Sequence, residues 1–379
     1  MSDRFHVIYR LVAANDADAA ALANAIAVED TVEIPRDVVP TGYIEDVVLG
    51  RVEAVEPAGD GVWHGRISYH IDATGAELPQ FINVVLGNAS ILAGVKAIAL
   101  ELNDDVRARF PGAAFGAAGL RRQIGRARGG FLCPVIKPQG SPTATLAELC
   151  YRTARAGADI IKEDHGLSNQ DAAPFRARVA ACAAAVARAN AERADAGDTS
   201  QALFFANIGG HGDQVRELAL YARDHGARGI LLIPGLFGFD AINRLRQLDG
   251  FELPIMAHPS HLGPYVLSPE HGYAHGLLLG TMMRLAGADI SVFPNHGGRF
   301  GFSVAECDEI AAACRAPDGP GPVILPSPGG GMSAERLPEL MAQYSEDCVY
   351  LLGGSILRLG DRIEAGIGDV RRVLDGGGV

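Results

Sequence analysis

The chain has 379 residues and a mass of 39.7 kDa, which exceeds one typical domain and predicts either two domains or one enlarged barrel. Apolar residues make up 48% and charged residues 21%, which suits a globular protein with a sizeable core and excludes a disordered chain. The formal charge of −12 disfavours nucleic acid and anionic membranes as partners, because both require clustered Lys and Arg, whereas a small anionic substrate needs only a local pocket.

The six cysteines lie far apart and form no Cys-x-x-Cys pair, so neither a zinc finger nor a redox dithiol is indicated. Most of them lie in apolar segments, which is typical of buried thiols in a reducing cytosol. The N-terminal residues show no basic segment followed by an apolar core, and no apolar run reaches the ~20 residues that span a bilayer. We therefore expect a soluble cytoplasmic protein.

The N-terminal part of the chain carries a mixed pattern of strands and helices. The order strand-helix-strand-strand-helix-strand describes a ferredoxin-like α+β domain, which we assign to residues 1–122. The Gly59-Asp60-Gly61 turn joins the two middle strands as a hairpin. The predicted strands are residues 5–13, 47–55, 62–71 and 95–102, and the predicted helices are residues 16–28 and 79–93.

From residue 123 to residue 379, short unbroken apolar runs alternate with amphipathic helical windows. This pattern indicates parallel strands that are covered on both faces. Eight such units in about 250 residues match a TIM (β/α)8 barrel, and a doubly wound open sheet is the alternative. The apolar runs are residues 131–136, 159–161, 202–208, 229–233, 254–257, 289–293, 323–326 and 348–352, and the helical windows are residues 143–156, 172–196, 212–226, 240–248, 271–286, 303–315, 333–344 and 358–375.

Polar and titratable residues follow these predicted strands, where the βα loops of a TIM barrel carry the chemistry. Lys137 follows the first strand, and Lys162, Asp164 and His165 follow the second. Because the strand ends meet at one mouth of the barrel, we expect their side chains to converge there. The other residues at these ends are Asn207 after the third strand, His258 after the fifth, Asn295 and His296 after the sixth, Gly329, Gly330 and Gly331 after the seventh, and Gly353, Gly354 and Ser355 after the eighth.

The cluster of Lys162, Asp164 and His165 is compatible with two chemistries. A protonated lysine has no lone pair, so Lys162 can join a metal site only when it is carbamylated or deprotonated; a carbamate would supply an anionic oxygen for Mg²⁺. The competing scheme is a Schiff-base lysine with a depressed pKa and no metal. Lys137 would serve either scheme, as a second cation or as a proton donor.

The glycine runs after the seventh and eighth strands predict a phosphate site. In this fold a phosphate is often held by backbone N–H groups of these two loops, and glycine lets the backbone approach the anion closely. Gly330 and Gly331 form one run, Gly353 and Gly354 form the other, and Ser355 adds a hydroxyl donor.

Over nearly its whole length, the chain resembles the large subunit of rubisco and its non-carboxylating relatives, the rubisco-like proteins. The segment from Gly157 to His165 is similar to the family motif Gly-x-Asp-Phe-x-Lys-x-Asp-Glu, which carries the carbamylated lysine and the Mg²⁺ ligands. The segment Ile136-Lys137-Pro138-Gln139-Gly140 looks like the first-strand segment of the family. Gly87-Asn88 resembles the turn whose asparagine reaches the substrate of the neighbouring subunit, Glu29 falls near a functional glutamate of the same domain, and both glycine runs look like the phosphate loops.

Several departures from the family pattern bear on the reaction. The loop-six lysine that rubisco needs for CO₂ addition is replaced by Asn295-His-Gly-Gly-Arg299-Phe, and the strand-six histidine by Val292. His258 is followed by Pro259, so the arginine for a second phosphate is lost. The third metal ligand is His165 instead of glutamate, and imidazole suits Zn²⁺, Mn²⁺ or Fe²⁺ better than Mg²⁺. The resemblance therefore implies a monophosphate substrate and no CO₂ fixation.

The resemblance implies metal-assisted enolisation of a keto-sugar monophosphate by a homodimer with shared active sites. Carbamylated Lys162, Asp164 and His165 would hold one divalent ion, with Mg²⁺ expected first and Mn²⁺, Zn²⁺ or Fe²⁺ as alternatives. Lys137 would exchange protons with the enediolate carbon. His258, Asn207 and Asn88 would orient hydroxyl groups, and Arg299 would bind a carboxylate.

The reaction expected first is decarboxylation or cleavage of a branched keto-acid phosphate similar to 3-oxo-isoapionate 4-phosphate, because loop six looks like that of rubisco-like proteins in sugar-acid catabolism. The first alternative is an enolase or isomerase of methionine salvage that acts on a methylthio-ketose phosphate. A Schiff-base aldolase is the second, and a catalytically decayed regulatory protein is the third.

Overall fold

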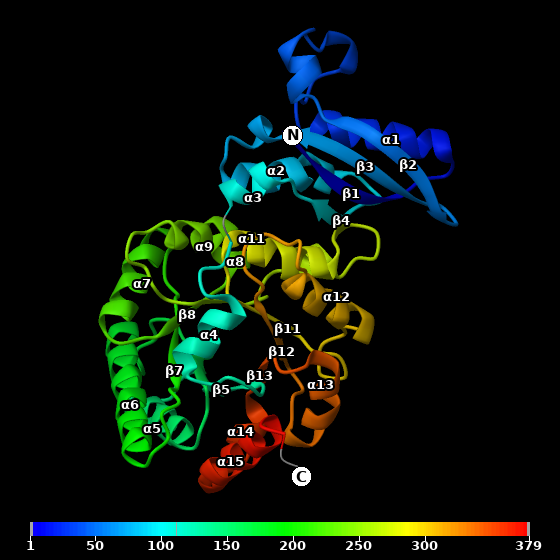
Figure 1. Cartoon of the computed structure of the whole chain (residues 1–379). Helices are drawn as coiled ribbons and strands as arrows, with labels where there is room; N and C mark the ends of the chain where they lie inside the picture. The colour runs from blue at the N-terminus through cyan, green and yellow to red at the C-terminus, as the bar shows by residue number, and fades with distance from the viewer. Residues whose placement is uncertain (1–2, 111, 377–379) are drawn as a thin grey trace.

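The computed structural model describes residues 3–110 and 112–376. The predicted domain ranges also include residues 1–2, 111 and 377–379, which lie outside the described residues. An N-terminal α+β domain lies above a larger α/β domain in Figure 1. Among the described residues, no helix combines the length and the apolarity needed to cross a membrane.

The N-terminal domain is an antiparallel sheet with two helices on one face, as a ferredoxin-like fold requires. Its central strand alternates between buried and half-buried residues, and Phe5, Val7, Tyr9 and Leu11 are fully buried. Asn15 caps the first helix by accepting a hydrogen bond from the Asp18 backbone N–H. The strand order is β4 (Val95–Glu101), β1 (Arg4–Val12), β3 (Val62–His70) and β2 (Arg51–Gly59), and the main helices are α1 (Asp16–Glu29) and α2 (Leu78–Leu86).

Two elements of this domain differ from the prediction, one in position and one in length. The strand predicted over residues 47–55 begins only at Arg51, because Ile44–Val48 forms a π-helical turn, η2. Helix α2 ends at Leu86 and not at residue 93, since Gly87 leaves the helical conformation; a Cβ there would lie 2.4 Å from the Asn83 carbonyl oxygen. The chain continues as a short 3₁₀ turn, η4 (Asn88–Ile91).

The barrel contributes a strand to the N-terminal sheet. Strand β10 (Gly272–Tyr273) pairs in parallel with β4, although helix was predicted from residue 271. The buried Lys96 ammonium on β4 donates to the carbonyl oxygens of Val266 (3.3 Å) and Ser268 (2.6 Å), just before β10. The predicted helix then follows as η6 (Leu277–Met282) and α11 (Met283–Ala286).

The second domain contains the eight predicted parallel strands in barrel order, so the TIM-barrel prediction is confirmed. Backbone pairing joins the strands from β12 round to β13, and the Ser327 hydroxyl of β12 donates to the Val349 carbonyl oxygen of β13 at 3.0 Å. This contact closes the sheet, so the open-sheet alternative is wrong. The strands are β5 (Phe131–Ile136), β6 (Ile160–Glu163), β7 (Leu203–Asn207), β8 (Gly229–Leu232), β9 (Ile255–Ala257), β11 (Ile290–Pro294), β12 (Leu325–Gly329) and β13 (Val349–Leu352).

Helix α4 (Gly116–Ile124) packs into the barrel interior: Ala117, Leu120 and Ile124 share one buried cluster with the inward residues of the strands. The helix crosses the boundary predicted between residues 122 and 123, which favours starting the barrel domain at Gly116. The outer helices are α5 (Thr143–Arg155), α6 (Phe175–Asp195), α7 (Val215–Asp224), α8 (Pro234–Phe237), α9 (Phe239–Arg246), α12 (Val304–Arg315), α13 (Leu337–Tyr344), α14 (Gly354–Leu357) and α15 (Ile363–Leu374), while the short α3 (Asp104–Arg109) and α10 (Gly263–Val266) lie in connecting segments.

Candidate active site

The strands direct five of the predicted site residues toward the barrel axis. Side chains alternate along a strand, so every second residue points inward. On β6, Ile160 belongs to the inner cluster, which places Lys162 inside as well. Four other site residues each lie two positions after an inner residue of their strand, so they point to the same side. These pairs are Val135 and Lys137, Phe205 and Asn207, Met256 and His258, and Leu351 and Gly353.

Lys162 is deeply buried, with only 2% of its surface exposed. Burial lowers the pKa of its ammonium group, although the neighbouring Cys133 and Asp164 oppose this effect, and the positive charge of Lys137 lowers the pKa further. Burial thus makes the neutral amine easier to form here than at an exposed lysine. A neutral amine can form either a carbamate with CO₂ or a Schiff base with a ketone.

Asp164 lies between the two lysines at the end of β6. Its Oδ2 atom is 3.7 Å from the Lys137 Nζ atom, and its Oδ1 atom accepts a hydrogen bond from the Gly166 N–H at 3.0 Å. Partial burial raises the pKa of Asp164, but this hydrogen bond and the charges of Lys162, His165 and Lys137 together lower it below its usual value. Asp164 is therefore an ionised carboxylate at neutral pH.

The two predicted histidines form a stacked pair. The rings of His165 and His258 are nearly parallel, with centroids 4.1 Å apart, and the His258 Nδ1 atom lies 3.0 Å from the Ser260 hydroxyl. Burial lowers the pKa of both rings, and the charge of Lys162 lowers both further, although Asp164 opposes the shift at His165. Both imidazoles are therefore neutral at pH 7, with nitrogen lone pairs available for a ligand.

Asn207 fixes the loop that carries His165. Its side-chain amide donates to the carbonyl oxygens of His165 (3.1 Å) and Leu167 (2.7 Å). Its Oδ1 atom is buried and has no hydrogen-bond partner among the described residues. A buried acceptor without a partner is costly, so this atom is suited to a substrate hydroxyl.

Glu163 and Arg178 form a buried ion pair on the outer side of β6, next to Lys162, and neither residue was predicted to belong to the site. Glu163 follows Lys162 on β6 and therefore points outward, where its Oε1 atom lies 2.7 Å from the Arg178 Nε atom of α6; both side chains are fully buried. Burial raises the pKa of Glu163, opposed by Arg178 and by the backbone N–H of Asn207 at 2.8 Å. Strand alternation predicts that Glu163 points outward, but not that Arg178 is its partner.

Asn295 and His296 are not turned into the barrel. Inner residues of β11 are Ile290 and Val292, so Asn295 has the outward parity. Its Oδ1 atom accepts from the Tyr344 hydroxyl at 2.7 Å, and its amide faces the Met332 sulfur at 3.4 Å. The His296 Nε2 atom lies 2.8 Å from the Gln343 Oε1 atom. These contacts with α13 and the loop before it do not favour substrate contacts for either residue.

The rest of loop six packs on the first glycine run. A Cβ on Gly331 would lie 2.5 Å from the Gly298 Cα atom, and a Cβ on Gly330 would lie 3.0 Å from the Phe300 ring. Both Gly330 and Gly331 have positive φ, which glycine adopts without strain. Arg299 is exposed, with its guanidinium 5.0 Å from the Phe300 ring centre, and its charge acts on His165. Arg299 therefore adds positive charge to this side of the mouth.

The second glycine run lies against Lys137. A Cβ on Gly353 would lie 3.2 Å from the Lys137 Nζ atom, whereas a Cβ on Gly354 would meet open space. The Ser355 hydroxyl is buried and has no hydrogen-bond partner among the described residues. The run thus combines room for an anion with an available hydroxyl donor.

Gly353→Ala tests the contact with Lys137. The added methyl group displaces the flexible end of Lys137 and not the backbone, so the fold should be kept while kcat falls by about 10–100-fold. Gly354→Ala is the matched control, because its methyl group enters open space and would change mainly the KM of a phosphorylated substrate. Steady-state kinetics of both variants make the comparison, and equal losses of kcat would contradict it.

Glu29 and Asn88 lie in the N-terminal domain. Glu29 is half-buried at the end of α1, and Asn88 is exposed at the start of η4. Asp30, which follows Glu29 in the chain, accepts a hydrogen bond from the Ala89 N–H at 3.0 Å. Exposure leaves Asn88 accessible to a second molecule, as the predicted shared site requires.

The unmodified side chains do not complete a metal site. Among the described residues, no three His, Cys, Asp or Glu side chains are grouped for a metal ion. Asp164 and His165 supply two donors, with the Oδ1 and Nδ1 atoms 3.6 Å apart. The donor set therefore fits a divalent ion only when Lys162 supplies a third ligand as a carbamate.

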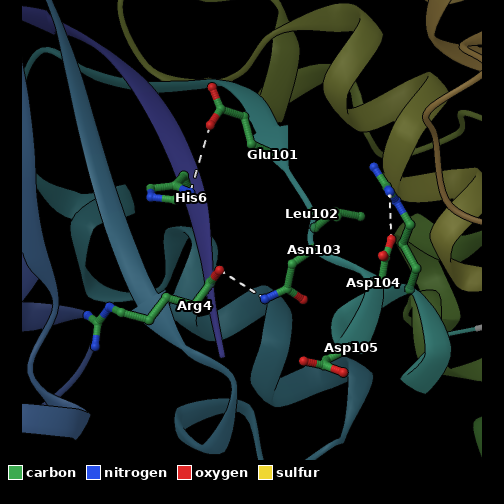
Figure 2. Close-up of a pocket in the computed structure, with 8 residues that line it drawn as sticks. Arg4, His6, Glu101, Leu102, Asn103, Asp104 and Asp105 are labelled. Carbon is green, nitrogen blue, oxygen red and sulfur yellow. Dashed lines mark hydrogen bonds and ion pairs between the residues drawn. The ribbon is translucent and has the colours of Figure 1, made fainter. Parts of the chain in front are cut away.

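A separate pocket of about 380 Å³ lies on the N-terminal domain, between β1, β4 and α3 (Figure 2). Its charged groups are engaged within the protein: His6 lies 3.8 Å from Glu101, and Arg107 lies 3.3 Å from Asp104. Three carboxylates line it against two guanidinium groups. The pocket therefore lacks the positive charge that a phosphate ligand requires, and the barrel mouth is the better candidate. The pocket is lined by Arg4, His6, Glu101, Leu102, Asn103, Asp104, Asp105 and Arg107.

Comparisons with known proteins identify relatives of this chain. Residues 116–299 match the family model of the ribulose bisphosphate carboxylase large chain, catalytic domain. The chain is 37% identical to 5-methylthioribulose-1-phosphate isomerase of Rhodospirillum rubrum, over 96% of this chain and 94% of the relative. It is 30% identical to 2,3-diketo-5-methylthiopentyl-1-phosphate enolase of Geobacillus thermodenitrificans, over 77% of this chain and 70% of the relative.

A solved structure extends the similarity to the whole fold. The rubisco-like protein from Rhodopseudomonas palustris has 32% sequence identity and a TM-score of 0.85, and the match covers 100% of this chain and 99% of that one. Both domains and the barrel mouth fall within this match. The chain therefore belongs to the rubisco large-chain family, as one of its rubisco-like proteins.

Proposed function

We propose that the protein is an enolising isomerase or enolase of a methylthio-ketose phosphate and not a carboxylase. The observation that carries the proposal is the convergence of Lys137, Asp164 and two neutral histidines around the buried Lys162 at one barrel mouth. Proton transfer next to a ketone needs such an arrangement, with one group to exchange the proton and others to stabilise the enediolate.

The relatives favour methionine-salvage chemistry over the decarboxylation that the sequence suggested first. Two of them are named for methylthio-sugar phosphates, and neither name includes a carboxylic acid. The decarboxylase hypothesis rests on the resemblance of loop six, in which Arg299 would bind the carboxylate, and Arg299 is an exposed side chain. We therefore place 5-methylthioribulose 1-phosphate first among substrates to test, with 2,3-diketo-5-methylthiopentyl 1-phosphate second.

Each side chain has a proposed role in this reaction. Lys137 exchanges a proton with the substrate carbon next to the ketone, and Asp164 holds the Lys137 ammonium in place. The Asn207 Oδ1 atom and the His258 ring orient substrate hydroxyls. The backbone N–H groups of Gly353 and Gly354 and the Ser355 hydroxyl bind the phosphate, with the first glycine run as the neighbouring wall.

A divalent ion fits this scheme through carbamylated Lys162, Asp164 and His165. Such an ion, Mg²⁺ in the first instance, would supply Lewis-acid stabilisation of the enediolate oxygens. The protein would be a homodimer in which Asn88 and Glu29 complete the site of the partner subunit. Mixing an Asn88→Ala variant with a Lys162→Met variant tests the sharing, because mixed dimers would regain one intact site.

The reaction is tested by NMR in D₂O with both methylthio-ketose phosphates and with branched keto-acid phosphates. Isomerisation or enolisation keeps every carbon and introduces deuterium next to the ketone. Loss of CO₂ or glycolate from a keto acid, with no turnover of the methylthio substrates, would restore the decarboxylase reading.

Metal removal should abolish the activity, and Mg²⁺ added together with bicarbonate should restore it more fully than Mg²⁺ alone. The chain contains only three lysines, Lys96, Lys137 and Lys162, so ¹³C NMR after equilibration with ¹³CO₂ can resolve a single carbamate. We expect one carbamate signal that is absent in Lys162→Met. Activity that persists in EDTA, together with borohydride trapping of substrate on a lysine, would favour the Schiff-base aldolase instead.

A further inference from the structure

A buried carboxylate joins the two N-terminal segments that the proposed function assigns to the partner's active site. Asp30 follows Glu29 at the end of α1, and only 5% of its surface is exposed. Its Oδ1 atom accepts the Ala89 N–H at 3.0 Å, and the backbone N–H of Gly87 also acts on the carboxylate. Asp30 thus binds the backbone on both sides of Asn88.

The turn around Asn88 is otherwise held by few side chains. A Cβ on Gly87 would lie 2.4 Å from the Asn83 carbonyl oxygen, so the turn requires glycine there, and Ala89 is fully buried. Within the part of the chain that the structure describes, no side chain caps η4 at its start. The carboxylate of Asp30 is therefore the side-chain contact that fixes the backbone of this turn against α1.

Burying the Asp30 carboxylate costs free energy of folding, and core packing alone does not require a carboxylate at this position. The Oδ2 atom is buried and has no hydrogen-bond partner among the described residues. An apolar residue would fill the same space without leaving an unpaired acceptor. A costly group that is joined to a predicted site residue points to a role in function rather than in the core.

We propose that Asp30 is a positioning residue, whose carboxylate fixes the Gly87–Ala89 turn so that Asn88 is presented to the active site of the partner subunit. The inference rests on the proposed function, since it assigns Asn88 to that site. It adds a residue at the C-terminal end of α1, outside the barrel mouth, on which turnover depends.

The position of Asp30 also predicts a pH dependence. Burial raises its pKa to about 7, although the N–H groups of Ala89 and Gly87 oppose this. The titratable groups that face it are Glu29 on α1, Tyr9 on β1, Tyr69 on β3 and Tyr273 on β10. Burial raises the pKa of all three tyrosines, so they stay neutral near pH 7, and Asp30 is the group that changes charge.

The ionised carboxylate holds the two N–H donors more firmly than the protonated acid does. The order of the turn should therefore increase as the pH rises through 7. Stability changes in the opposite direction: the native state keeps this proton to a higher pH than the unfolded chain, whose Asp pKa is about 3.9. Stability from this group is therefore lost as the pH rises from about 4 to about 7.

Hydrogen exchange at the Ala89 amide tests the contact without reference to catalysis. In the full-length protein, Asp30→Ala should accelerate this exchange at least about tenfold, and Asp30→Asn, which keeps an oxygen acceptor, should accelerate it less. Asp18→Asn, an exposed carboxylate on the same helix, is the matched control and should leave it unchanged. Unaltered exchange in Asp30→Ala would overturn the proposal whatever the activity.

Kinetics of the same variants test the positioning role. Asp30→Ala should lower kcat/KM by about tenfold. Asp30→Asn should stay folded and active, lose the rise of kcat/KM near pH 7, and show a smaller fall in Tm between pH 5.5 and 8 than the wild type. A wild-type pH profile in Asp30→Asn would overturn the proposal even if Asp30→Ala does not fold.

The Asn88→Ala variant distinguishes the positioning role of Asp30 from the role proposed for Asn88 in the partner's active site. If Asn88→Ala lowers turnover and Asp30→Ala does not, the positioning role is wrong and the assignment of Asn88 stands. If Asn88→Ala has no effect while exchange at Ala89 still depends on Asp30, the proposed role of Asn88 fails, and Asp30 only maintains the turn.

Discussion

Lys137→Met is expected to lower kcat/KM by about 10²–10⁴-fold, the usual cost of losing a general acid–base group. Lys137 is half-buried directly after β5, with its Nζ atom 3.7 Å from Asp164 and next to Gly353. Methionine has a similar length and no proton to exchange. Deuterium incorporation next to the substrate ketone, measured by NMR in D₂O, should fall by the same factor as turnover.

Lys137→Arg distinguishes proton exchange from a simple cation effect. The guanidinium group keeps the positive charge beside Asp164, but its pKa is too high for it to exchange a proton at neutral pH. We expect arginine to be nearly as inactive as methionine. An arginine variant with a third or more of wild-type turnover would show that Lys137 acts through its charge alone.

Arg178→Met is expected to destabilise the protein by about 3–5 kcal/mol, because it leaves the Glu163 carboxylate buried without its partner. The pair is fully buried behind β6, so solvent cannot replace the lost contact. Urea denaturation and the shift in Tm measure the effect. The double variant Glu163→Gln/Arg178→Met should recover part of the loss, since it removes the unpaired charge.

An exposed ion pair on the same helix supplies the matched control. Arg176 pairs with Glu217, and both side chains are more than half exposed. Arg176→Met should change the stability by less than about 1 kcal/mol, as surface pairs generally do. Similar losses for Arg176→Met and Arg178→Met would mean that the buried pair has no special weight in holding the end of β6.

The architecture follows from local patterns in the sequence. Unbroken apolar runs predict the eight barrel strands within a few residues, because strands buried on both faces leave no polar alternation. The same alternation rule places Lys137, Lys162 and His258 inside the barrel. It also turns Asn295 outward, because Ile290 and Val292 are the inner residues of β11.

The remaining features depend on contacts between distant segments. Arg178 lies 15 positions after Glu163, and Asp30 lies 59 positions before Ala89, so neither partner can be read from spacing. Strand β10 has only two residues, too few for any periodic signal, and it forms because β4 presents an open edge. The identity of the substrate and of the metal depends on small differences at the barrel mouth, because its residue types suit several reactions.

The two-residue strand β10 has a consequence for how this protein can be divided. Through β10, a segment of the barrel domain pairs with β4 of the N-terminal sheet. Beside it, the Lys96 ammonium donates a hydrogen bond to the Ser268 carbonyl oxygen. An N-terminal fragment expressed alone would expose the edge of β4 and leave a buried ammonium without its carbonyl acceptors. Such a fragment should aggregate. A chimera that exchanges this domain between relatives should fold only when residues 266–274 are exchanged together with it.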